Sequence, residues 1–451
     1  MYKVTITELN ELLETKQIPK LKELLHRMKV QDVAHFISKI EDKDLDLSIV
    51  VFRLLSKDVA ARVFSYLDKH TKHEFVNAIS TAELNIISKE LYLDDFVDLL
   101  EEMPANVVKK ILRNTPQKRR NLVNEFLKYK EDSAGTIMTV EFVTLKDTLN
   151  VGQAIKKIRK EAPDKETINI CYIIDATRKL VGSITLAKLV LADEAEKVKD
   201  IMDKKIIAST TMEDQEEVAK KFIKYELIAM PVVDKEHKMV GIITVDDVMH
   251  IIKEEAIEDM EKMAGLSPTE KPYFKTSVLE LAKSRIVWLL LLMASSMITG
   301  MILESYEAAF ATIPILVTFI PMITGTGGNC GAQSSTVIIR GMSVGEVTPK
   351  DTLKVMWKEL RVSILVGLAL SAVNFIRIMI FNPDQVNVAI VVSIAILLTV
   401  VLSKLVGCVL PIVAKVLKLD PAIMAAPLIT TIVDAVSLVI FFTLAVKVLG
   451  I

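Results

Sequence analysis

The sequence is short of the residues that mark several common protein classes. It has three cysteines, Cys171, Cys330 and Cys408, which lie far apart and form no CxxC pair, so we expect free thiols. All six histidines lie in the first 250 residues, and neither an HExxH motif nor a glycine-rich phosphate loop is present. The opening residues have no apolar core of the signal-peptide type. These absences argue against an enzyme and favour a first half that stays in the cytoplasm.

Charge is scarce in the last third of the chain. Before Lys283 there are 44 basic and 49 acidic residues, a net charge of −5; from Lys283 onwards there are 12 basic and 8 acidic residues, a net charge of +4. Apolar residues make up 51% of the chain, and the mean hydropathy is +0.38. This distribution predicts an acidic soluble half joined to a membrane half.

Five apolar stretches are each long enough to cross a bilayer, which takes about 20 helical residues. They are 286–303, 308–339, 362–381, 386–414 and 421–446. Basic residues gather before the first stretch, between the second and third, and between the fourth and fifth. By the positive-inside rule, the N-terminus is cytoplasmic and the C-terminus lies outside. The expected location is therefore a cell membrane, inner or plasma, with several passes through the lipid.

The fifth stretch contains one charged residue, Asp434. A charge at bilayer depth is costly and usually marks an ion pathway or a paired site. Lys404 in the fourth stretch is the candidate partner, because it lies about 17 Å of helix from Lys415 and Asp434 lies about 21 Å from Asp420, so the depths are similar. Asp434 is thus either a pore ligand or half of a structural ion pair.

The segment 320–340 holds four glycines, at positions 325, 327, 328 and 331. They either break the helix around a polar cavity or let helices pack closely through small residues. Asn329 and Gln333 nearby favour a polar lining.

The first half has two sequence patterns. Residues 1–132 show helical spacing throughout, whereas 133–253 contain a repeat in which "CYIIDATRKLVGSITLAKLV" resembles "MPVVDKEHKMVGIITVDDVM". The repeat resembles a CBS-domain pair, a regulatory module in which a Thr-x-x-Asp often holds a nucleotide ribose. Thr244 and Asp247 fit that pattern, while the first copy has Thr185 and Lys188. The resemblance makes ATP or another adenine nucleotide a candidate ligand.

An acidic helix follows the repeat, over residues 246–264, and is expected to end near Gly265 because Pro268 cannot continue it easily. Positions 247, 254, 258 and 261 share one face of this helix and are all acidic. This acidic face is either simply solvated, or it influences a pore, because the helix lies directly before the first span.

Taken together, the helical domain, the repeat, the acidic helix and the motifs "GTGGNCGAQSSTVIIRG" and "LDPAIMAAPLITTIVDAVSL" resemble the MgtE family of magnesium channels. The resemblance implies a homodimer with its pore between subunits, Asp434 as the pore carboxylate, and Asn329 and Gln333 as pore-lining residues. It also implies regulatory Mg²⁺ sites at acidic positions of the first half and its junction with the spans. These positions are Asp94, Asp98, Asp214, Glu216, Glu226, Asp247, Glu258, Asp259 and Asp420.

Three positions depart from the family pattern. Ala332 and Ala426 stand where the family has asparagine, and Arg62 stands where its N-terminal domain has an acid.

The expected fold class is a multidomain membrane protein. It has an all-α superhelical N-terminal domain, an α/β CBS-domain pair, an acidic connecting helix and a five-helix transmembrane pore domain. The expected helical N-terminal domain covers 1–132, and the two CBS domains cover 133–196 and 197–245. The connecting (plug) helix and linker cover 246–275, and the transmembrane pore domain covers 276–451.

The expected function is a Mg²⁺-selective channel that imports Mg²⁺ into the cytoplasm and is closed by cytoplasmic Mg²⁺ on the acidic faces. The expected partners are a second copy of the chain, Mg²⁺ ions and membrane lipid, with no nucleic acid. Two alternatives remain at this point. One is a coupled secondary transporter that uses Asp434 and Lys404 as a proton site, and the other is a membrane-anchored nucleotide sensor.

Overall fold

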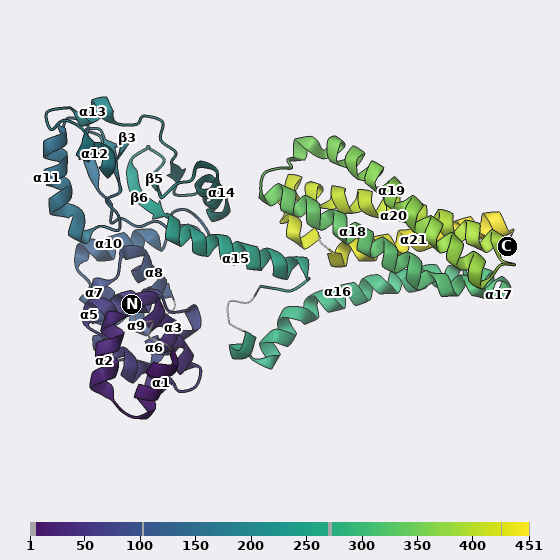
Figure 1. The fold of residues 1–451 in the computed structure, drawn as a ribbon, viewed down its shortest axis with the longest axis horizontal. Coiled ribbons are helices and arrows are strands. Elements are labelled where there is room, and N and C mark those ends of the chain that lie inside the picture. Colours follow the sequence, from purple (N-terminus) through teal and green to yellow (C-terminus); the bar gives the residue numbers. More distant parts are fainter. Residues whose placement is uncertain (1–5, 102, 269–272, 425, 451) are drawn as a thin grey trace. The chain divides into compact units, whose positions relative to one another are not determined.

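The computed structural model describes residues 6–101, 103–268, 273–424 and 426–450 (Figure 1). The chain divides into two compact units, residues 1–253 and 254–451, which we call the N-terminal unit and the membrane unit.

The N-terminal unit begins with short amphipathic helices whose starts are set by local capping. Asp44 and Asp68 each accept a hydrogen bond from a backbone N–H in the first turn, and Ser80 forms a capping box with Glu83. The helices are α1 (Ile6–Glu14), α2 (Ile18–Arg27), α3 (Val30–Glu41), α4 (Leu45–Phe52), α5 (Lys57–Ser65), α6 (Lys69–Ala78), α7 (Thr81–Glu90), α8 (Leu93–Glu101), α9 (Ala105–Asn114) and α10 (Gln117–Phe126). The expected all-helical domain is confirmed.

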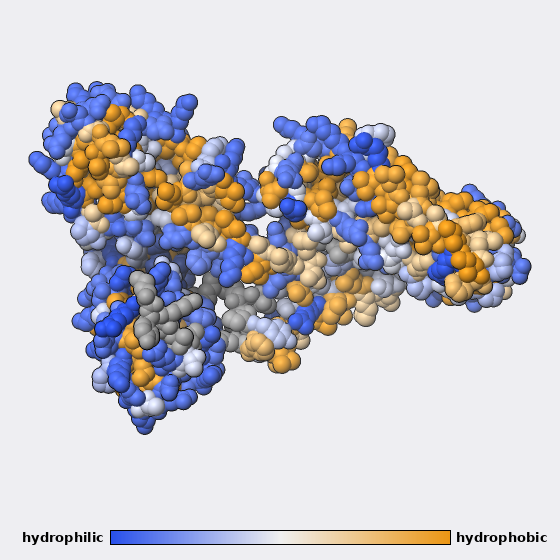
Figure 2. All heavy atoms as spheres, in the orientation of Figure 1, coloured by the Kyte–Doolittle hydropathy of each residue, from blue (hydrophilic) through white to orange (hydrophobic). Residues whose placement is uncertain are grey.

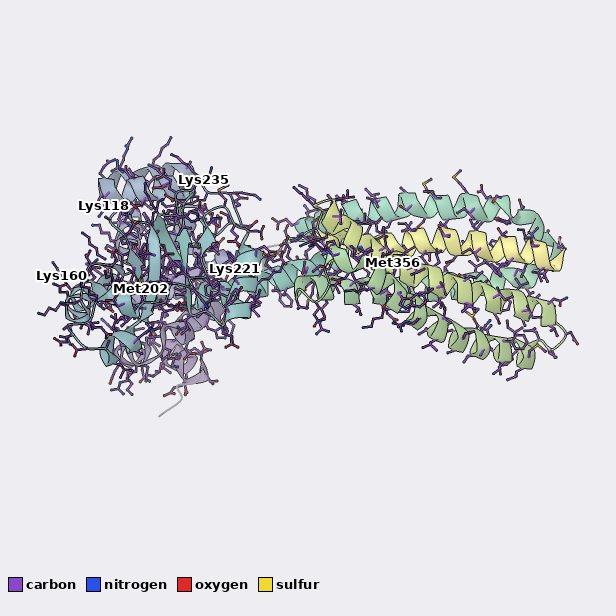
Figure 3. The ribbon with its side chains drawn as sticks, turned by 90° about the horizontal axis from the view of Figure 1, so that it is seen from above. Lys118, Lys160, Met202, Lys221, Lys235 and Met356 are labelled. Atoms are coloured by element: carbon purple, nitrogen blue, oxygen red, sulfur yellow. The ribbon has the colours of Figure 1, made fainter. Side chains whose placement is uncertain are left out.

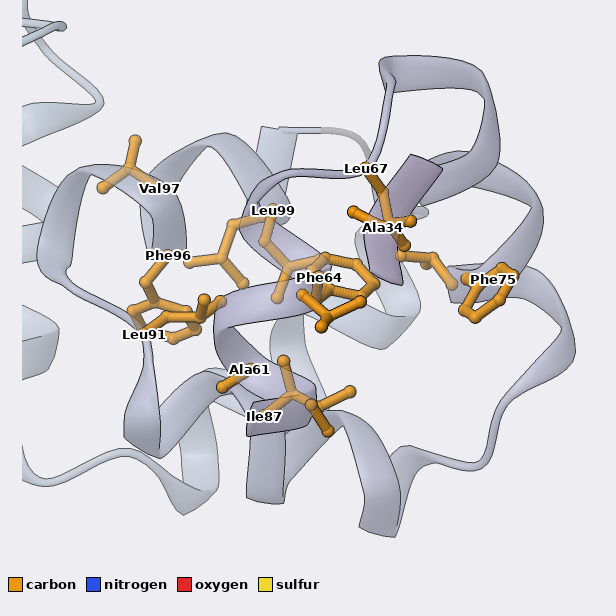
Figure 4. Close-up of a cluster of buried hydrophobic side chains, with 14 of the residues drawn as sticks. Ala34, Ala61, Phe64, Leu67, Phe75, Ile87, Leu91, Phe96, Val97 and Leu99 are labelled. Atoms are coloured by element: carbon orange, nitrogen blue, oxygen red, sulfur yellow. The ribbon is translucent and has the colours of Figure 1, made fainter. Parts of the chain in front are cut away.

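Aromatic side chains hold these short helices together. Phe64, Phe75 and Phe96 are fully buried in the cluster shown in Figure 4. The Phe52 ring packs edge-on against Phe75, with 5.3 Å between ring centroids. Each helix is too short to be stable alone in water, so this shared core is what keeps it folded.

The sequence repeat folds as two three-stranded sheets of the same topology. In each, a parallel pair is followed by an antiparallel pair, in the orders β1-β2-β3 and β4-β5-β6. The register shifts at equivalent places, between Ile173 and Ile174 and between Val232 and Val233. The strands are β1 (Thr144–Lys146), β2 (Ile170–Ile174), β3 (Leu180–Thr185), β4 (Ser209–Thr210), β5 (Ala229–Val233) and β6 (Met239–Thr244), and the helices are α11 (Val151–Glu161), α12 (Leu186–Leu191), α13 (Val198–Ile201) and α14 (Gln215–Tyr225).

The helical domain and the second sheet share one hydrophobic core. Met138, Phe222 and Ile243 belong to the same buried cluster as the aromatic residues of the first ten helices. Lys221, labelled in Figure 3, donates to the Glu213 carboxylate at 2.7 Å and so ties α14 to the loop before it. The beginning of α15 (Val245–Met263) follows β6 directly, and Val248 joins this core.

Among the residues that the structure describes, the membrane unit contains five helices that are long and apolar enough to cross a membrane, as expected from the sequence. On the face shown in Figure 2, hydrophobic residues spread over much of this unit. Its elements after α15 are η2 (Tyr273–Lys275), α16 (Val278–Ser305), α17 (Glu307–Thr312), η3 (Pro314–Phe319), α18 (Ile320–Ser343), η4 (Pro349–Asp351), α19 (Thr352–Phe381), α20 (Val386–Val416), η5 (Pro421–Met424) and α21 (Ala426–Leu449). Figures 1 and 3 show the long helices running side by side.

The glycine cluster does not break its helix, because α18 is continuous from Ile320 to Ser343. A Cβ atom at Gly328 would lie 2.8 Å from the Thr430 methyl carbon, and one at Gly407 would lie 2.2 Å from the Gly331 carbonyl oxygen. The glycines therefore let α18 pack closely against α20 and α21. Of the two interpretations of segment 320–340, helix breaking is wrong and close packing is confirmed.

Candidate functional site

Asp434 lies on α21, half-buried, one turn after the contact between Thr430 and Gly328 of α18. Among the residues that the structure describes, none forms a hydrogen bond or ion pair with its carboxylate. The hydroxyls of Thr430 and Thr431 both donate to the Pro427 carbonyl, at 2.9 and 3.1 Å, and so are engaged within their own helix. Asp434 thus lies on a membrane span, and no residue that the structure describes supplies a cation that compensates its charge.

Lys404 is not the partner of Asp434. Its Nζ lies 3.9 Å from Glu359 Oε2 and 3.3 Å from Ser334 Oγ, and Ser334 Oγ donates to the same Glu359 oxygen at 2.7 Å. The structural-pair alternative for Asp434 is therefore wrong. The reason is that α19 supplies a carboxylate, Glu359, three residues before the apolar stretch that the sequence delimits.

This charged cluster lies on the wall of an open cavity of about 750 Å³ in the membrane unit. Asn329 and Gln333 line the same cavity, as does Ala332, one of the departures from the family pattern. The remaining lining residues are Ser334, Thr336, Val337, Glu359, Val362 and Lys404. The expectation of a polar lining around Asn329 and Gln333 agrees with this arrangement, whereas Asp434 is not among the residues that line the cavity.

A second group of carboxylates is partly buried in the N-terminal unit. It joins Asp94 and Asp95 of α8, Glu166 of the loop before β2, and Asp247 of α15. Burial, together with the charges of Asp95 and Asp247, raises the pKa of Asp94 well above its usual value. Burial raises the pKa of Asp95 to about 6, although Lys72 opposes the shift.

The other two members respond in the same direction. Burial raises the pKa of Asp247 to about 6 despite the hydrogen bond that Thr244 donates at 2.6 Å. Burial and then the charges of Asp247 and Asp246 raise the pKa of Glu166 to about 8. Asp98 adds to the repulsion that Asp95 and Asp247 experience. These acids therefore lie close enough together to repel one another.

Two oxygens of this acidic cluster are buried without any hydrogen-bond partner, Asp94 Oδ1 and Glu166 Oε2. A buried carboxylate oxygen without a hydrogen-bond donor is strongly unfavourable, and such an oxygen is a suitable ligand for a hard dication. Within the described ranges, however, no three His, Cys, Asp or Glu side chains converge closely enough to hold a metal ion as they stand. The cluster has the donor chemistry of a Mg²⁺ site, and its side chains would have to draw together to form one.

The end of α15 carries a third ionic group. Lys262 Nζ donates to Asp420 Oδ2 at 2.7 Å and also pairs with Glu258. Burial lowers the pKa of Lys262, but its hydrogen bonds to Asp420 and Glu258 outweigh this and raise it, so the group is an ammonium. Glu258 and Asp420, two predicted Mg²⁺ ligands, are thus held together by the ammonium group of Lys262. The helix ends as expected, with Gly265 at φ +70°.

The remaining predicted acids are spread over α14 and α15. Asp214 caps the start of α14, and Glu216 pairs with Lys220 at 3.0 Å. Glu226 follows the last residue of α14, so the length of this helix, about 16 Å, separates it from Asp214. Asp259 follows Glu258 on α15. The structure therefore does not gather the predicted regulatory acids into one site within the chain. Arg62 makes an exposed pair with Asp58 at 3.7 Å, and the side chain of Ala426 lies outside the described residues.

Of the two predicted nucleotide residues, Thr244 ends β6 and donates to Asp247 in the first turn of α15. A separate groove of about 660 Å³ lies in the N-terminal unit beside Thr185, the equivalent threonine of the first copy. Thr185 caps α12 by accepting from the Lys188 backbone N–H at 3.2 Å. Nucleotide binding at Thr244 and Asp247 stays a prediction.

Sequence reasoning missed three acids of these groups. Glu359 was hidden because it lies outside the apolar stretch 362–381, and Glu166 lies in a loop without a repeat or helical pattern. Asp95 is adjacent to the predicted Asp94 and would have been found by considering both acids at the start of α8.

Comparison with known proteins follows the same division of the chain. Family models match residues 28–132 as the MgtE intracellular N domain, residues 134–194 and 198–254 as CBS domains, and residues 320–444 as a divalent cation transporter. The chain is 33% identical over 441 residues to the magnesium transporter MgtE of Thermus thermophilus, covering 97% of each chain. The chain belongs to the MgtE family. It is a multi-pass membrane protein of a transporter family and not an enzyme.

A second curated relative and two solved structures are also similar to this chain. The magnesium transporter MgtE of Bacillus subtilis is 32% identical over 434 residues, covering 94% of this chain and 95% of the relative. A crystal structure of the cytosolic domain of the Mg²⁺ channel MgtE in complex with ATP matches 55% of this chain and 100% of its own, with 33% identity and a TM-score of 0.51. The soluble part of a magnesium transporter matches with 27% identity and the same TM-score, covering 56% of this chain and 98% of its own. The CBS pair and the helical N-terminal domain expected from the sequence are confirmed.

Proposed function

We propose that this member of the MgtE family is a Mg²⁺-selective channel that imports Mg²⁺ into the cytoplasm and is closed by cytoplasmic Mg²⁺. The observation that carries the proposal is Asp434, a carboxylate without a compensating partner among the described residues, on a span of a divalent-cation transporter family. A carboxylate within a membrane span is costly unless a cation binds it.

The proposed pore lies between two copies of the chain, so that each contributes one Asp434. Two carboxylates across a symmetry axis repel each other, and a dication relieves this repulsion. Mg²⁺ gives up its water reluctantly, so the path should accept a largely hydrated ion. Asn329 and Gln333, which line the cavity, offer amide groups suited to such an ion.

Closure is proposed to use the acidic cluster of the N-terminal unit and the end of α15. At high Mg²⁺, ions bridge Asp94, Asp247 and their neighbours and hold the closed state. At low Mg²⁺, the bare carboxylates repel one another and the domains separate. The ligand drives closure only because it binds the closed state more tightly. The buried oxygens of Asp94 and Glu166 that lack donors support this role.

The proposed orientation has the N-terminus in the cytoplasm, supported by the basic residues flanking the spans. A nucleotide at the CBS pair is part of the proposal as a second regulatory ligand, because the related cytosolic domain forms a complex with ATP. The coupled-transporter alternative has lost its main support, since Lys404 contacts Glu359 and Ser334.

The test is a recording from the full-length protein in a planar bilayer, with Mg²⁺ as the permeant cation. A channel gives unitary currents, which a coupled carrier does not. Asp434→Asn should abolish them while the protein remains a folded dimer. Asp384→Asn, which neutralises an exposed carboxylate between α19 and α20, is the matched control and should conduct normally. Normal currents through Asp434→Asn, or Mg²⁺ uptake without unitary currents, would contradict the proposal.

A further inference from the structure

The charged cluster of the membrane unit joins three helices at one point on the cavity wall. Ser334 comes from α18, Glu359 from α19 and Lys404 from α20. Only 7% of the Lys404 side chain and 14% of the Glu359 side chain are exposed. The close approach of Gly407 to Gly331, one turn from Lys404, fixes α20 against α18 at this level. The cluster is therefore positioned by rigid helix packing.

The same cluster borders the proposed ion pathway. Lys404, Glu359 and Ser334 line the cavity that Asn329 and Gln333 line. A lysine ammonium has three donors, and its contacts with Ser334 and Glu359 leave donor capacity toward the cavity. A dication entering this cavity therefore meets a carboxylate and, a few ångströms away, a fixed positive charge.

The two charges act on that dication in opposite directions. Glu359 alone would hold Mg²⁺ tightly, because a carboxylate is a preferred ligand and the site is partly desolvated. Lys404 repels the dication and competes for the same carboxylate oxygen. Conduction requires binding that is favourable enough for entry and weak enough for exit.

We propose that Glu359 is a cation-binding carboxylate of the transport path and that Lys404, positioned through Ser334, is a tethered counter-cation that weakens Mg²⁺ binding there. This inference rests on the proposed ion path. It assigns to Lys404 a role in setting the affinity for the transported ion, separate from its structural contribution.

The test measures Mg²⁺ uptake by liposomes against external Mg²⁺, together with thermal unfolding of the full-length protein with and without MgCl₂. In Lys404→Met, the half-saturating Mg²⁺ concentration should fall about tenfold, because the competing charge is gone, and the maximal rate should fall as release slows. MgCl₂ should also raise the melting temperature of this variant more than that of the unaltered protein. Adding Glu359→Gln should remove both effects.

Two further variants separate the cation role from a structural one. Lys415→Met removes an exposed lysine from the same helix and should change neither measurement. Ser334→Ala keeps both charges but frees Glu359 from the hydroxyl, so it should shift half-saturation in the same direction by less. It also provides the test if Lys404→Met fails to fold.

An unchanged half-saturation in folded Lys404→Met would overturn the inference, as would Mg²⁺-dependent stabilisation that survives Glu359→Gln. If Lys404→Met does not fold, an unchanged Ser334→Ala overturns it. Failure of the proposed function is distinguishable, because Asp434→Asn would then transport normally. If Asp434→Asn is inactive and Lys404→Met keeps its half-saturation, only the inference about Lys404 and Glu359 fails.

Discussion

Partly buried carboxylates have different neighbours in the two units. In the N-terminal unit, burial raises the pKa of Asp94 and of Glu166, and the nearby charge of Asp247 raises both further. In the membrane unit, Glu359 has the Lys404 ammonium 3.9 Å away, and Asp420 has that of Lys262 at 2.7 Å. The acidic cluster of the N-terminal unit thus gathers several negative charges, whereas in the membrane unit Glu359 and Asp420 each have a counter-cation from the chain and Asp434 has none among the described residues.

The difference indicates how each group should respond to Mg²⁺. Carboxylates that repel one another gain from an external dication, so their unit becomes more stable when Mg²⁺ binds. A carboxylate that already has an ammonium partner gains less, because Mg²⁺ has to displace that partner. The first arrangement suits a sensor, and the pair of Glu359 with Lys404 on the cavity wall suits a path through which an ion passes.

The largest effect should come from removing a counter-cation in the membrane unit. Lys404→Met leaves the Glu359 carboxylate unpaired and should lower the free energy of unfolding by about 3 kcal/mol, the lower end of the range for breaking a buried pair. Thermal unfolding in detergent without Mg²⁺ measures this, and Lys415→Met is the control. A melting temperature equal to that of the unaltered protein would mean that the pair does not stabilise the unit.

The same kind of neutralisation should have the opposite sign in the N-terminal unit. Asp94→Asn removes a buried charge and should stabilise α8 by about 1–2 kcal/mol without Mg²⁺, the order of one unsatisfied buried group. Hydrogen exchange of peptides from α8 measures this, and the advantage should disappear when Mg²⁺ is added. Asp32→Asn, at an exposed position of α3, is the control. Faster exchange in Asp94→Asn without Mg²⁺ would contradict the repulsion.

The pH dependence of the N-terminal unit should follow from the raised pKa values, which are about 8 for Glu166 and about 6 for Asp95 and Asp247. The folded state binds more protons than the unfolded state, so stability falls as pH rises from the unfolded carboxyl values through the folded ones. Without Mg²⁺, the amides of α8 and of the start of α15 should be less protected at pH 8 than at pH 6, when each exchange rate is divided into the intrinsic rate of the unfolded chain at the same pH. Mg²⁺ should flatten this dependence, and protection that increases with pH would contradict the account.

Much of the architecture was predictable because hydrophobic periodicity and repetition are local signals. The repeat at 171–190 and 230–249 predicted the paired sheets, and five long apolar stretches, each with at most one charged residue, predicted the five spans. The continuity of α18 was not predictable, because four glycines are compatible with both a break and a close contact. Only the positions of Thr430 and Gly407 on neighbouring helices decide between them.

The ionic partners were less predictable because they depend on contacts between distant segments. The similar depths of Asp434 and Lys404 along their helices suggested that these two residues form an ion pair. In the structure, Lys404 instead pairs with Glu359, which lies at the flank of another span. Lys262 was not expected to bridge Glu258 and Asp420, which lie 162 positions apart in the sequence. Spacing along one helix identifies a face, but it does not identify what that face contacts.

The smallest effect should come from the counter-cation at the end of α15. Lys262→Met removes the ammonium that occupies Glu258 and Asp420, so Mg²⁺ should close the channel at a concentration about threefold lower, as expected for a partly exposed pair. Currents recorded against cytoplasmic Mg²⁺ measure the shift. Lys253→Met, at an exposed position of the same helix, is the control. A shift to higher Mg²⁺ would show that Lys262 assists closure.

The most direct test of the central claim is the open probability of the channel against cytoplasmic Mg²⁺ in the combined variant Asp247→Asn, Glu258→Gln and Asp259→Asn. The unaltered protein should close as Mg²⁺ rises on the order of millimolar, a range expected for sites that leave Mg²⁺ much of its water. Potassium chloride at matched ionic strength controls for screening and should not close it. The variant should stay open throughout this range, because it lacks three of the acids proposed to bind Mg²⁺. Closure of the variant with an unchanged midpoint, or equal closure by potassium chloride, would contradict the central claim.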